Sequence, residues 1–296
     1  MESTRDIRRR LRAVRGTAKI TRAMQLVAAS KMRRAQQAAT AGRRYSIRLE
    51  ELADRLLRME LPSGDELPPL LRPRNIRRRC IVFVATDRGL CGSLNQNTLR
   101  LIRESCSDNA SYVAIGRRGG QALAALRLPL IGEFSVNDAV PSHQSRAVAN
   151  FLRDAYLSGE IDSVEVVYPL FINTLRQNPV SVRLLPMGDF GESIRAKRDM
   201  LPDAPLAMPE DGRPMTVEPS LLEVLEVLAE SFLHMELRHI FLEAKAAEQS
   251  ARTVAMKSAT DSADALAKEL LLAYNKARQA AITAEILEIC SSKPAR

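Results

Sequence analysis

The first candidate for chemistry is the turn Gly89-Leu90-Cys91-Gly92, which follows a short apolar run at 80–85. Backbone amides in a glycine-rich turn after a strand can hold a phosphate group. No Lys-Ser or Lys-Thr follows these glycines, however, and no GxGxxG pattern surrounds them. The turn therefore favours a structural role over a nucleotide-binding role.

Other side chains that could catalyse a reaction or bind a metal are isolated in the sequence. His234 and His239 are five residues apart, which places them about 140° apart around a helix, so they cannot chelate a metal as an i, i+4 pair does. His143 stands alone, and Cys91 has Arg88 beside it but no base in the local sequence that would activate its thiol. We therefore expect no catalytic residue, no cofactor and no metal.

Positive charge is concentrated at the N-terminus. Residues 1–49 contain fourteen Lys or Arg against two carboxylates and carry +12, whereas the remainder carries −3 and the whole chain +9. This balance implies an acidic partner such as nucleic acid, anionic lipid or an acidic protein surface. The basic stretch lacks interleaved aromatic residues, since the first is Tyr45, and this weakens the nucleic-acid interpretation.

The cysteines and the hydropathy pattern indicate the compartment. The four cysteines form no CxxC pair and no framework of a small secreted domain, so we expect reduced thiols in the cytosol and no disulfide. No run of 18 apolar residues exists, and no membrane span is expected.

Two long helices are predicted at the ends of the chain. Residues 220–293 contain neither glycine nor proline, and small or apolar residues recur there at alternating steps of four and three, the spacing of a coiled-coil seam. These seam positions are Ala259, Ala263, Leu266, Leu270, Ala273, Ala277, Ala280, Ala284 and Leu287. The N-terminus has the same spacing at Ile7, Leu11, Val14, Ala18, Thr21, Gln25, Ala28, Met32, Ala35 and Ala39. We expect the two helices to pair antiparallel, with the polar Thr21 and Gln25 fixing the register.

The sequence between these helices alternates between strand and helix patterns. Strands are expected at 80–85, 112–115, near Leu130, at 163–168 and at 179–186, and helices from about 97, at 118–127 and at 143–157. Proline-rich stretches at 61–74 and 188–219 bound this region. The predicted fold class is mixed α+β and α/β: a long antiparallel coiled coil of the N- and C-terminal helices with an inserted small α/β, Rossmann-like domain. The expected domains are the N-terminal helix at 1–57, the inserted domain at 75–190, and the C-terminal helix at 217–290, which pairs with 1–57.

Three segments resemble the gamma subunit, the central-stalk rotor, of the rotary ATP synthase. The first helix contains KITRAM at 19–24 and VAASKMRRAQ at 27–36, and the inserted region contains DRGLCG at 87–92 followed by Leu94 and Asn95. The last helix contains Ser250-Ala251-Arg252, Met256, ATD at 259–261 and YNKARQAAITAE at 274–285. The segments lie at the start, middle and end, so the resemblance covers essentially the whole chain.

The resemblance implies a rotor subunit that is not catalytic by itself. Its coiled coil would turn inside a ring of alternating alpha and beta subunits, and the inserted domain and lower stalk would meet the epsilon subunit and the membrane c-ring. The rotor would couple ion flow through that ring to ATP synthesis from ADP and phosphate, or ATP hydrolysis to ion pumping. By the resemblance, Arg252, Arg278, Gln279 and Thr283 match residues that grip a loop of the catalytic subunits, and Met24 matches one near an acidic lever. The subunit would lie peripherally on the cytoplasmic side of a bacterial membrane.

Some positions depart from the pattern of that family. Ser292-Lys293 stands where a Gly-Ala pair is usual, Thr216 stands where an aromatic residue is common, and residues 229–243 lack the usual Leu-Pro-Arg-Tyr type of stretch. Two alternatives remain open at this point: a coiled-coil nucleic-acid-binding protein, which would bind in a salt-sensitive way, and a nucleotide-dependent α/β enzyme, which would bind nucleotide as the isolated chain.

Overall fold

The computed structural model describes residues 4–57, 59, 67–72, 74–104, 109–187 and 216–291. The chain divides into two compact units. The paired-helix unit comprises Met1–Ala29 and Arg252–Arg296, and the sheet unit comprises Ser30–Ala251. Half of the predicted proline-rich stretch at 61–74 and most of that at 188–219 lie outside the described residues.

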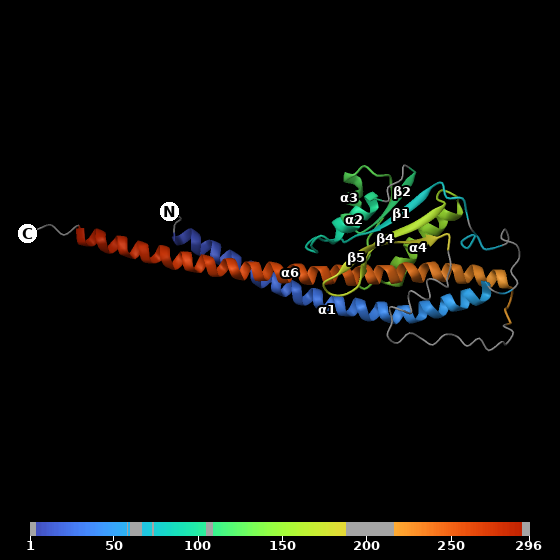
Figure 1. The fold of residues 1–296 in the computed structure, drawn as a ribbon, viewed down its shortest axis with the longest axis horizontal. Helices are drawn as coiled ribbons and strands as arrows, with labels where there is room; N and C mark the ends of the chain where they lie inside the picture. Colours follow the sequence, from blue (N-terminus) through green and yellow to red (C-terminus); the bar gives the residue numbers. More distant parts are fainter. Residues whose placement is uncertain are drawn as a thin grey trace, which may run out of the picture. The chain divides into compact units, whose positions relative to one another are not determined.

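Each of two long helices lies partly in the paired-helix unit and partly in the sheet unit (Figure 1). They are α1 (Thr4–Leu57) and α6 (Leu221–Ser291), which confirm the two predicted helices. α6 begins at a capping arrangement, in which Glu223 N donates to Ser220 Oγ at 3.3 Å and Ser220 Oγ donates to Glu223 Oε1 at 3.0 Å. Neither these helices nor any other described helix is long and apolar enough to cross a membrane.

The α1 side of the paired-helix unit is buried at the predicted seam positions. Ile7, Leu11, Ala18, Thr21 and Ala28 are buried, and Val14 and Gln25 are half-buried. The two helices run antiparallel (Figure 1), and the Oγ1 atoms of Thr21 and Thr260 lie 2.6 Å apart between them. Arg22 and Asp264 form an ion pair at 2.8 Å beside this contact. The polar contact at Thr21 therefore lies where the spacing predicted a register-setting position.

The α6 side of the seam differs from the prediction. The positions that become buried or half-buried at steps of four and three are Met256, Thr260, Ala263, Ala267, Leu270, Tyr274 and Ala277. Ala263, Leu270 and Ala277 were predicted correctly, but Leu266 is 45% exposed whereas its neighbour Ala267 is 8% exposed. The reason is that alanines occur both on the seam and on the surface of α6, so the alanine spacing alone fits two phases.

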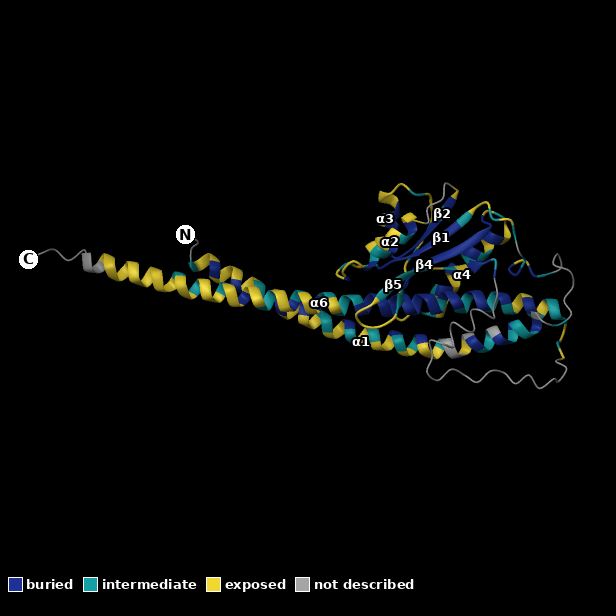
Figure 2. Cartoon of the chain, viewed as in Figure 1, coloured by how far each residue is buried: buried dark blue, intermediate teal, exposed yellow. Residues whose placement is uncertain are grey.

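The last predicted seam positions, Ala280, Ala284 and Leu287, are exposed (Figure 2). Thr21 faces Thr260, and both helices rise by the same distance per residue, so Thr4 faces about residue 277. The described part of α1 thus begins opposite Ala277, and α6 continues to Ser291 with no described α1 residue opposite it.

The sheet unit contains a five-stranded sheet in the order β3-β2-β1-β4-β5. Its strands are β1 (Arg79–Val84), β2 (Ala110–Ile115), β3 (Leu130–Phe134), β4 (Ser163–Phe171) and β5 (Gln177–Leu185). The first four run parallel, and β5 pairs antiparallel with β4. The five predicted strands are confirmed. The helices are α2 (Leu94–Glu104), α3 (Arg117–Ala125) and α4 (Ser142–Leu157), and α2 begins three residues before the predicted start.

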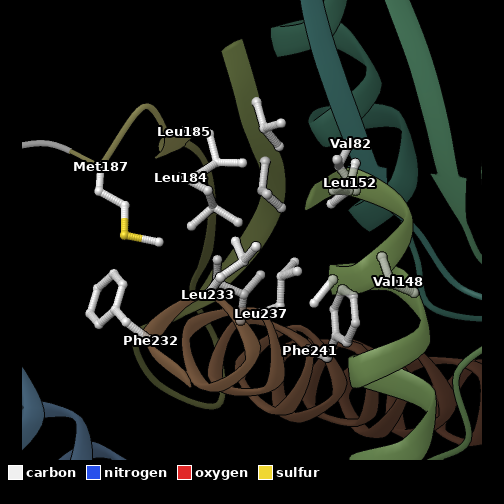
Figure 3. Close-up of a cluster of buried hydrophobic side chains, with 14 of the residues drawn as sticks. Val82, Val148, Leu152, Leu184, Leu185, Met187, Phe232, Leu233, Leu237 and Phe241 are labelled. Atoms are coloured by element: carbon white, nitrogen blue, oxygen red, sulfur yellow. The ribbon is translucent and has the colours of Figure 1, made fainter. Parts of the chain in front are cut away.

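The two faces of the sheet are covered by different helices. Alternate residues of β1 point to opposite faces: Ile81 and Phe83 pack in one cluster with Ile102 of α2 and Leu123 of α3, whereas Val82 packs in the other. That second cluster includes Val148 and Leu152 of α4 and Leu233, Leu237 and Phe241 of α6 (Figure 3). The part of α6 before residue 252 thus belongs to the core of the sheet unit.

Two local arrangements hold the strand ends. Gly116 ends β2 at φ 93°, and a Cβ there would lie 2.5 Å from Ala85 O, so only glycine fits. Before β1, Arg77 N and Arg78 N donate to Asp162 Oδ2 at 3.1 and 2.8 Å, and these bonds, foremost that from Arg78, lower the pKa of Asp162.

The loop between β3 and α4 connects to both long helices within the sheet unit. Lys31 of α1 pairs with Asp138 Oδ2 at 2.7 Å, and Gln249 of α6 donates to Asp138 Oδ1 at 3.3 Å. The Asp138 carboxylate therefore accepts hydrogen bonds from both helices. Its two partners, Lys31 and Gln249, lie within two residues of the boundaries of the sheet unit.

Candidate functional site

The turn after β1 is held by its own hydrogen bonds. Thr86 N donates to Asn95 Oδ1 at 3.2 Å, Asn95 Nδ2 donates to Thr86 Oγ1 at 2.7 Å, and Thr86 Oγ1 donates to Arg88 O at 2.8 Å. Cys91 is buried in this turn, and its neighbours Leu90 and Gly92 adopt left-handed backbone conformations with φ of 65° and 61°. Hydrogen bonds between its own residues thus hold the turn in one conformation.

The strand order reverses beside β1, because the chain places β2 and β3 on one side and β4 on the other. Open α/β sheets bind ligands beyond the carboxyl ends of the strands at such a point. Here the crevice is lined by Thr86 and Gly116 after β1 and β2, and by Phe241, Lys245 and Glu248 of α6. The remaining cavity is about 10 Å³, roughly the room for one water molecule. Side chains of α6 therefore leave little room in the crevice where open α/β sheets bind ligands.

The two histidines of α6 have separate partners. His234 Nε2 lies 2.9 Å from Asn150 Oδ1, and burial lowers the pKa of His234. His239 Nε2 lies 3.1 Å from Glu243 Oε1, and Tyr168 donates to the same carboxylate at 3.5 Å. The described residues contain no group of three His, Cys, Asp or Glu side chains that could hold a metal.

The described cysteines of the sheet unit are buried and free. Cys80 lies in β1, where burial raises the pKa of its thiol to about 12. Its thiol therefore stays protonated and unreactive at neutral pH.

The five predicted contact residues all lie in the paired-helix unit, in two groups. Arg278, Gln279 and Thr283 are exposed on α6 within about 140° of one another. Met24 and Arg252 are half-buried, and the Thr21–Thr260 register places them within about 8 Å along the helix pair. The second group lies about 39 Å along α6 from Arg278, so the structure does not bring all five together.

The paired-helix unit also carries an unusual share of exposed apolar side chains. It contains a quarter of the residues but ten of the nineteen exposed large apolar side chains in the described part of the chain. They are Ile20, Leu26 and Val27 in α1 and Val254, Leu266, Leu271, Leu272, Ile282, Ile286 and Leu287 in α6.

These side chains lie beside the predicted contact residues. Ile282 and Ile286 lie between Arg278 and Thr283 around α6, while Ile20 and Val27 share the face of α1 that points away from the seam. The sequence analysis missed this apolar surface. The sequence does contain a pattern that indicates it, because the apolar residues Ile20 and Val27 are seven residues apart and lie outside the seam spacing.

An exposed apolar surface on a pair of helices indicates a protein partner that covers it. The sequence family described as ATP synthase matches residues 3–295. The ATP synthase gamma chain of Opitutus terrae is 41% identical over 297 residues, covering 99% of this chain and 98% of the relative. That of Methylacidiphilum infernorum is 40% identical over 298 residues, covering 99% of each.

The chain belongs to the ATP synthase gamma chain family. A gamma chain is the central-stalk rotor subunit of a rotary ATP synthase. Among solved structures, a chain of the Euglena gracilis mitochondrial ATP synthase rotor is similar, with a TM-score of 0.64, 18% identity, and coverage of 94% of this chain and 98% of that one. A chain of the OSCP/F1/c-ring structure from the same organism has a TM-score of 0.67 at 18% identity, with coverage of 98% and 93%. At this identity the likeness shows the fold of the gamma chain.

Proposed function

We propose that this gamma chain is a non-catalytic rotor whose paired-helix unit turns inside a ring of alternating alpha and beta subunits. It couples ion flow through a membrane c-ring to ATP synthesis from ADP and phosphate at the beta subunits, or ATP hydrolysis to ion pumping. Its sheet unit meets the epsilon subunit and the c-ring, and the chain is peripheral on the cytoplasmic side of a bacterial membrane. The observation that carries this proposal is the exposed apolar surface of the paired-helix unit.

That surface is suited to a surrounding sleeve of protein. Past Ala277, α6 has no described α1 residue opposite it, yet it presents Ile282, Ile286 and Leu287 at 48, 54 and 63% exposure. Apolar side chains on an unpaired helix end gain free energy when a partner buries them. A ring that encloses the end of α6 provides this burial on every side.

The asymmetry of a helix pair explains how a rotor can act on several catalytic sites. Two helices lack threefold symmetry, so three surrounding sites face different sides of the pair, and rotation exchanges these sides among them. By linkage, a rotor that changes nucleotide affinity must bind the conformations of a site with different free energies. A shift in affinity of about 10⁴-fold requires about 5.5 kcal/mol, whereas a hydrogen bond to a charged group contributes about 1.5–3 kcal/mol. Several contacts must therefore share the work.

We assign these contacts to the two groups of predicted residues. Arg278, Gln279 and Thr283 grip a loop of the catalytic subunits, and their exposure leaves the guanidinium and amide groups accessible. Met24 and Arg252 contact the catalytic subunits lower on the helix pair. The strongly basic N-terminal stretch suits the acidic lever expected near Met24.

The filled crevice of the sheet supports a non-catalytic role for the chain itself. Phe241, Lys245 and Glu248 occupy the position at which an α/β enzyme would bind nucleotide. Neither the nucleotide-dependent enzyme nor the nucleic-acid-binding protein is favoured by the family of the chain.

Two experiments test the proposed function. Affinity purification of the tagged chain from solubilised membranes should recover the alpha, beta, epsilon and c subunits, and recovery of the chain alone would refute the proposal. In the assembled complex, Arg278→Ala or Gln279→Ala should slow ATP turnover by about ten- to a hundredfold, since about 1.4 kcal/mol corresponds to tenfold, and the double variant should be slower still. The control is Glu288→Ala, at an exposed position about 180° around α6 from Gln279. Parent turnover in the assembled double variant would remove both residues from the mechanism.

A further inference from the structure

The segments that lead into the four parallel strands meet at one end of the sheet, because parallel strands have their amino ends on the same side. Backbone hydrogen bonds join these segments: Asp162 N donates to Arg78 O at 2.8 Å, and Tyr112 N donates to Pro129 O at 2.8 Å. The helices α2, α3 and α4 end just before β2, β3 and β4, so their last turns lie at the same amino end. Four separate parts of the chain thus form one surface.

Apolar side chains are exposed on this surface. Leu126 just after α3, Leu130 at the start of β3 and Leu157 at the end of α4 are 38, 37 and 45% exposed. Residues 109–132, which include α3, contain three arginines and no Asp or Glu. This part of the amino end therefore combines apolar and basic side chains without acidic ones.

Exposed positive charges outnumber exposed negative ones among the described residues of this end. The exposed arginines are Arg77, Arg78, Arg103, Arg127 and Arg183, and the exposed carboxylates are Glu104, Asp154 and Glu160. Asp154 pairs with Arg153 at 2.9 Å. Two further carboxylates, Asp162 and Glu165, are buried and pair with arginines at 3.3 and 2.8 Å. The accessible charge of the surface is therefore positive.

The amino end of the sheet points toward the beginning of α6. Val82 in the middle of β1 packs in one cluster with Leu233 of α6 (Figure 3). The crevice beyond the carboxyl end of β1 is lined by Lys245, further along α6. β1 therefore runs in the same direction as α6, and its amino end lies toward Leu221, where α6 begins. In the proposed function, that part of the chain belongs to the lower stalk, which meets the c-ring in the membrane.

We propose that this amino-end surface contacts anionic phospholipid headgroups of the membrane that holds the complex. Its residues are Arg77, Arg103, Leu126, Arg127, Leu130 and Leu157. Arginine binds phosphate groups bidentately, and an anionic leaflet attracts basic residues that lie near it. Exposed apolar side chains beside basic ones are suited to the boundary between headgroups and acyl chains. The inference rests on the proposed function, which gives the orientation of the chain relative to the membrane.

Rotation favours lipid over a stationary protein as the partner of this surface. A fluid leaflet exchanges its molecules as the chain turns, so the contact persists at every angle. A protein that does not rotate with the chain would have to release the surface once in every turn. The contact adds a lipid surface to the sheet unit, separate from the predicted contacts of the paired-helix unit.

The test uses the assembled complex in vesicles made of equal parts phosphatidylcholine and phosphatidylglycerol. The photo-crosslinking amino acid p-benzoylphenylalanine replaces Leu130, and irradiation should link position 130 to lipid, detected by mass spectrometry of the peptide. The control places the same amino acid at Leu90, which is 60% exposed but lies in the turn after the carboxyl end of β1; this position should give no lipid crosslink. Equal lipid crosslinks from both positions, crosslinks from position 130 only to protein, or none from it would overturn the proposal.

A third position separates failure of this inference from failure of the proposed function. The photo-crosslinking amino acid at Ile282 should link the paired-helix unit to the surrounding subunits. If position 282 links to those subunits and position 130 does not link to lipid, the lipid contact is wrong and the rotor function stands. If position 282 links to no other subunit, the proposed function fails.

The charge requirement is tested by the lipid and by the protein. In vesicles of phosphatidylcholine alone, the lipid crosslink yield from position 130 should be lower by about fivefold or more. Arg77→Glu combined with Arg103→Glu should lower it by a similar factor in the mixed vesicles, because repulsion replaces attraction.

The matched control combines Arg117→Glu with Arg118→Glu. These exposed arginines at the start of α3 lie at the carboxyl end of the sheet, and the same change of charge there should leave the yield within about twofold of the parent. Equal yields in the two kinds of vesicle, or equal losses in the two double variants, would refute an anionic lipid contact at the amino end.

Discussion

From the structure, we predict that α1 and α6 pack most closely in the paired-helix unit at Ala28. Its side chain is 1% exposed on the seam face of α1. In Ala28→Leu, three additional carbon atoms must fit where one methyl group is already covered by the partner helix. The helices must then separate or the leucine must take an unfavourable rotamer, and such overpacking costs about 1–3 kcal/mol.

Hydrogen exchange measured by mass spectrometry on the isolated chain gives the local effect of this change. A loss of about 1–3 kcal/mol in the free energy of opening corresponds to exchange that is about 5- to 150-fold faster. The faster exchange should occur in peptides near Ala28 and in the facing part of α6, around Thr253. Peptides from the strands of the sheet unit should exchange as in the parent.

The matched control is Ala23→Leu on the same helix. Ala23 is exposed and lies about 140° around α1 from Ala28, so the added carbons extend into solvent and the effect should stay within about 0.5 kcal/mol. The isolated chain is essential, because the face that contains Ala23 is expected to touch neighbouring subunits in the complex. If Ala28→Leu exchanges like the parent, or if both variants exchange equally fast, Ala28 is not in a tightly packed interface.

Three further predictions concern single contacts. Valine in place of Thr21 and Thr260, singly and together, should reveal a coupling of about 0.5–1.5 kcal/mol by hydrogen exchange, and strictly additive losses would contradict a direct contact. Gly116→Ala should lower the thermal midpoint clearly, since left-handed strain alone costs about 1–3 kcal/mol, whereas Gly89→Ala, with no positive φ and its nearest neighbour at 3.4 Å, should melt like the parent; equal midpoints would argue against the strain. The lowered pKa of Asp162 stabilises the fold above its ordinary value of 3.8, and this contribution disappears as the pH falls through the lower native pKa. Asp162→Asn should therefore be less stable than the parent in urea at neutral pH but nearly equal to it at about pH 2, and a constant difference would exclude the linkage.

The sequence predicted most of the fold because its strongest patterns are set by local physics. β1 is recognisable as a continuous β-branched run, since a parallel strand covered on both faces has no polar side to reveal its period. The α1 seam was predicted correctly because large or polar residues such as Ile7, Leu11 and Thr21 distinguish its phase. The absence of glycine and proline from 220 to 293 likewise defined α6.

The errors and omissions arise where the pattern is degenerate or the contact is distant. Ala259 and Ala267 have the same side chain, so the sequence does not tell which phase of α6 meets α1. The exposed positions Ala280, Ala284 and Leu287 follow from the register of Thr21 with Thr260, residues far apart in the chain that no local pattern connects. The hydrogen bonds from Ser250 to the turn after β4 are equally non-local.

The middle of α6 contains buried polar residues whose burial no local sequence pattern reveals. Every residue from 239 to 250 is buried, although this stretch contains Glu243, Lys245, Glu248 and Gln249. A helix buried on all sides is normally apolar all round, so no local pattern indicates that this stretch is buried. Several of these polar groups have partners within the sheet unit: Lys245 pairs with Glu248 at 3.1 Å, three residues along the same helix. Isolated charges would be too costly at this depth, but pairs formed along one helix bring their own partners into the core. Other polar contacts join α6 to the sheet: Tyr168 of β4 donates to Glu243 at 3.5 Å, and Ser250 donates to Thr174 O at 2.8 Å. A rotation of the helix about its axis would break these contacts, whereas the pairs along the helix would persist. We infer that these contacts with Tyr168 and Thr174 resist twisting of α6 relative to the sheet, and resistance to twisting is a property that a rotor requires.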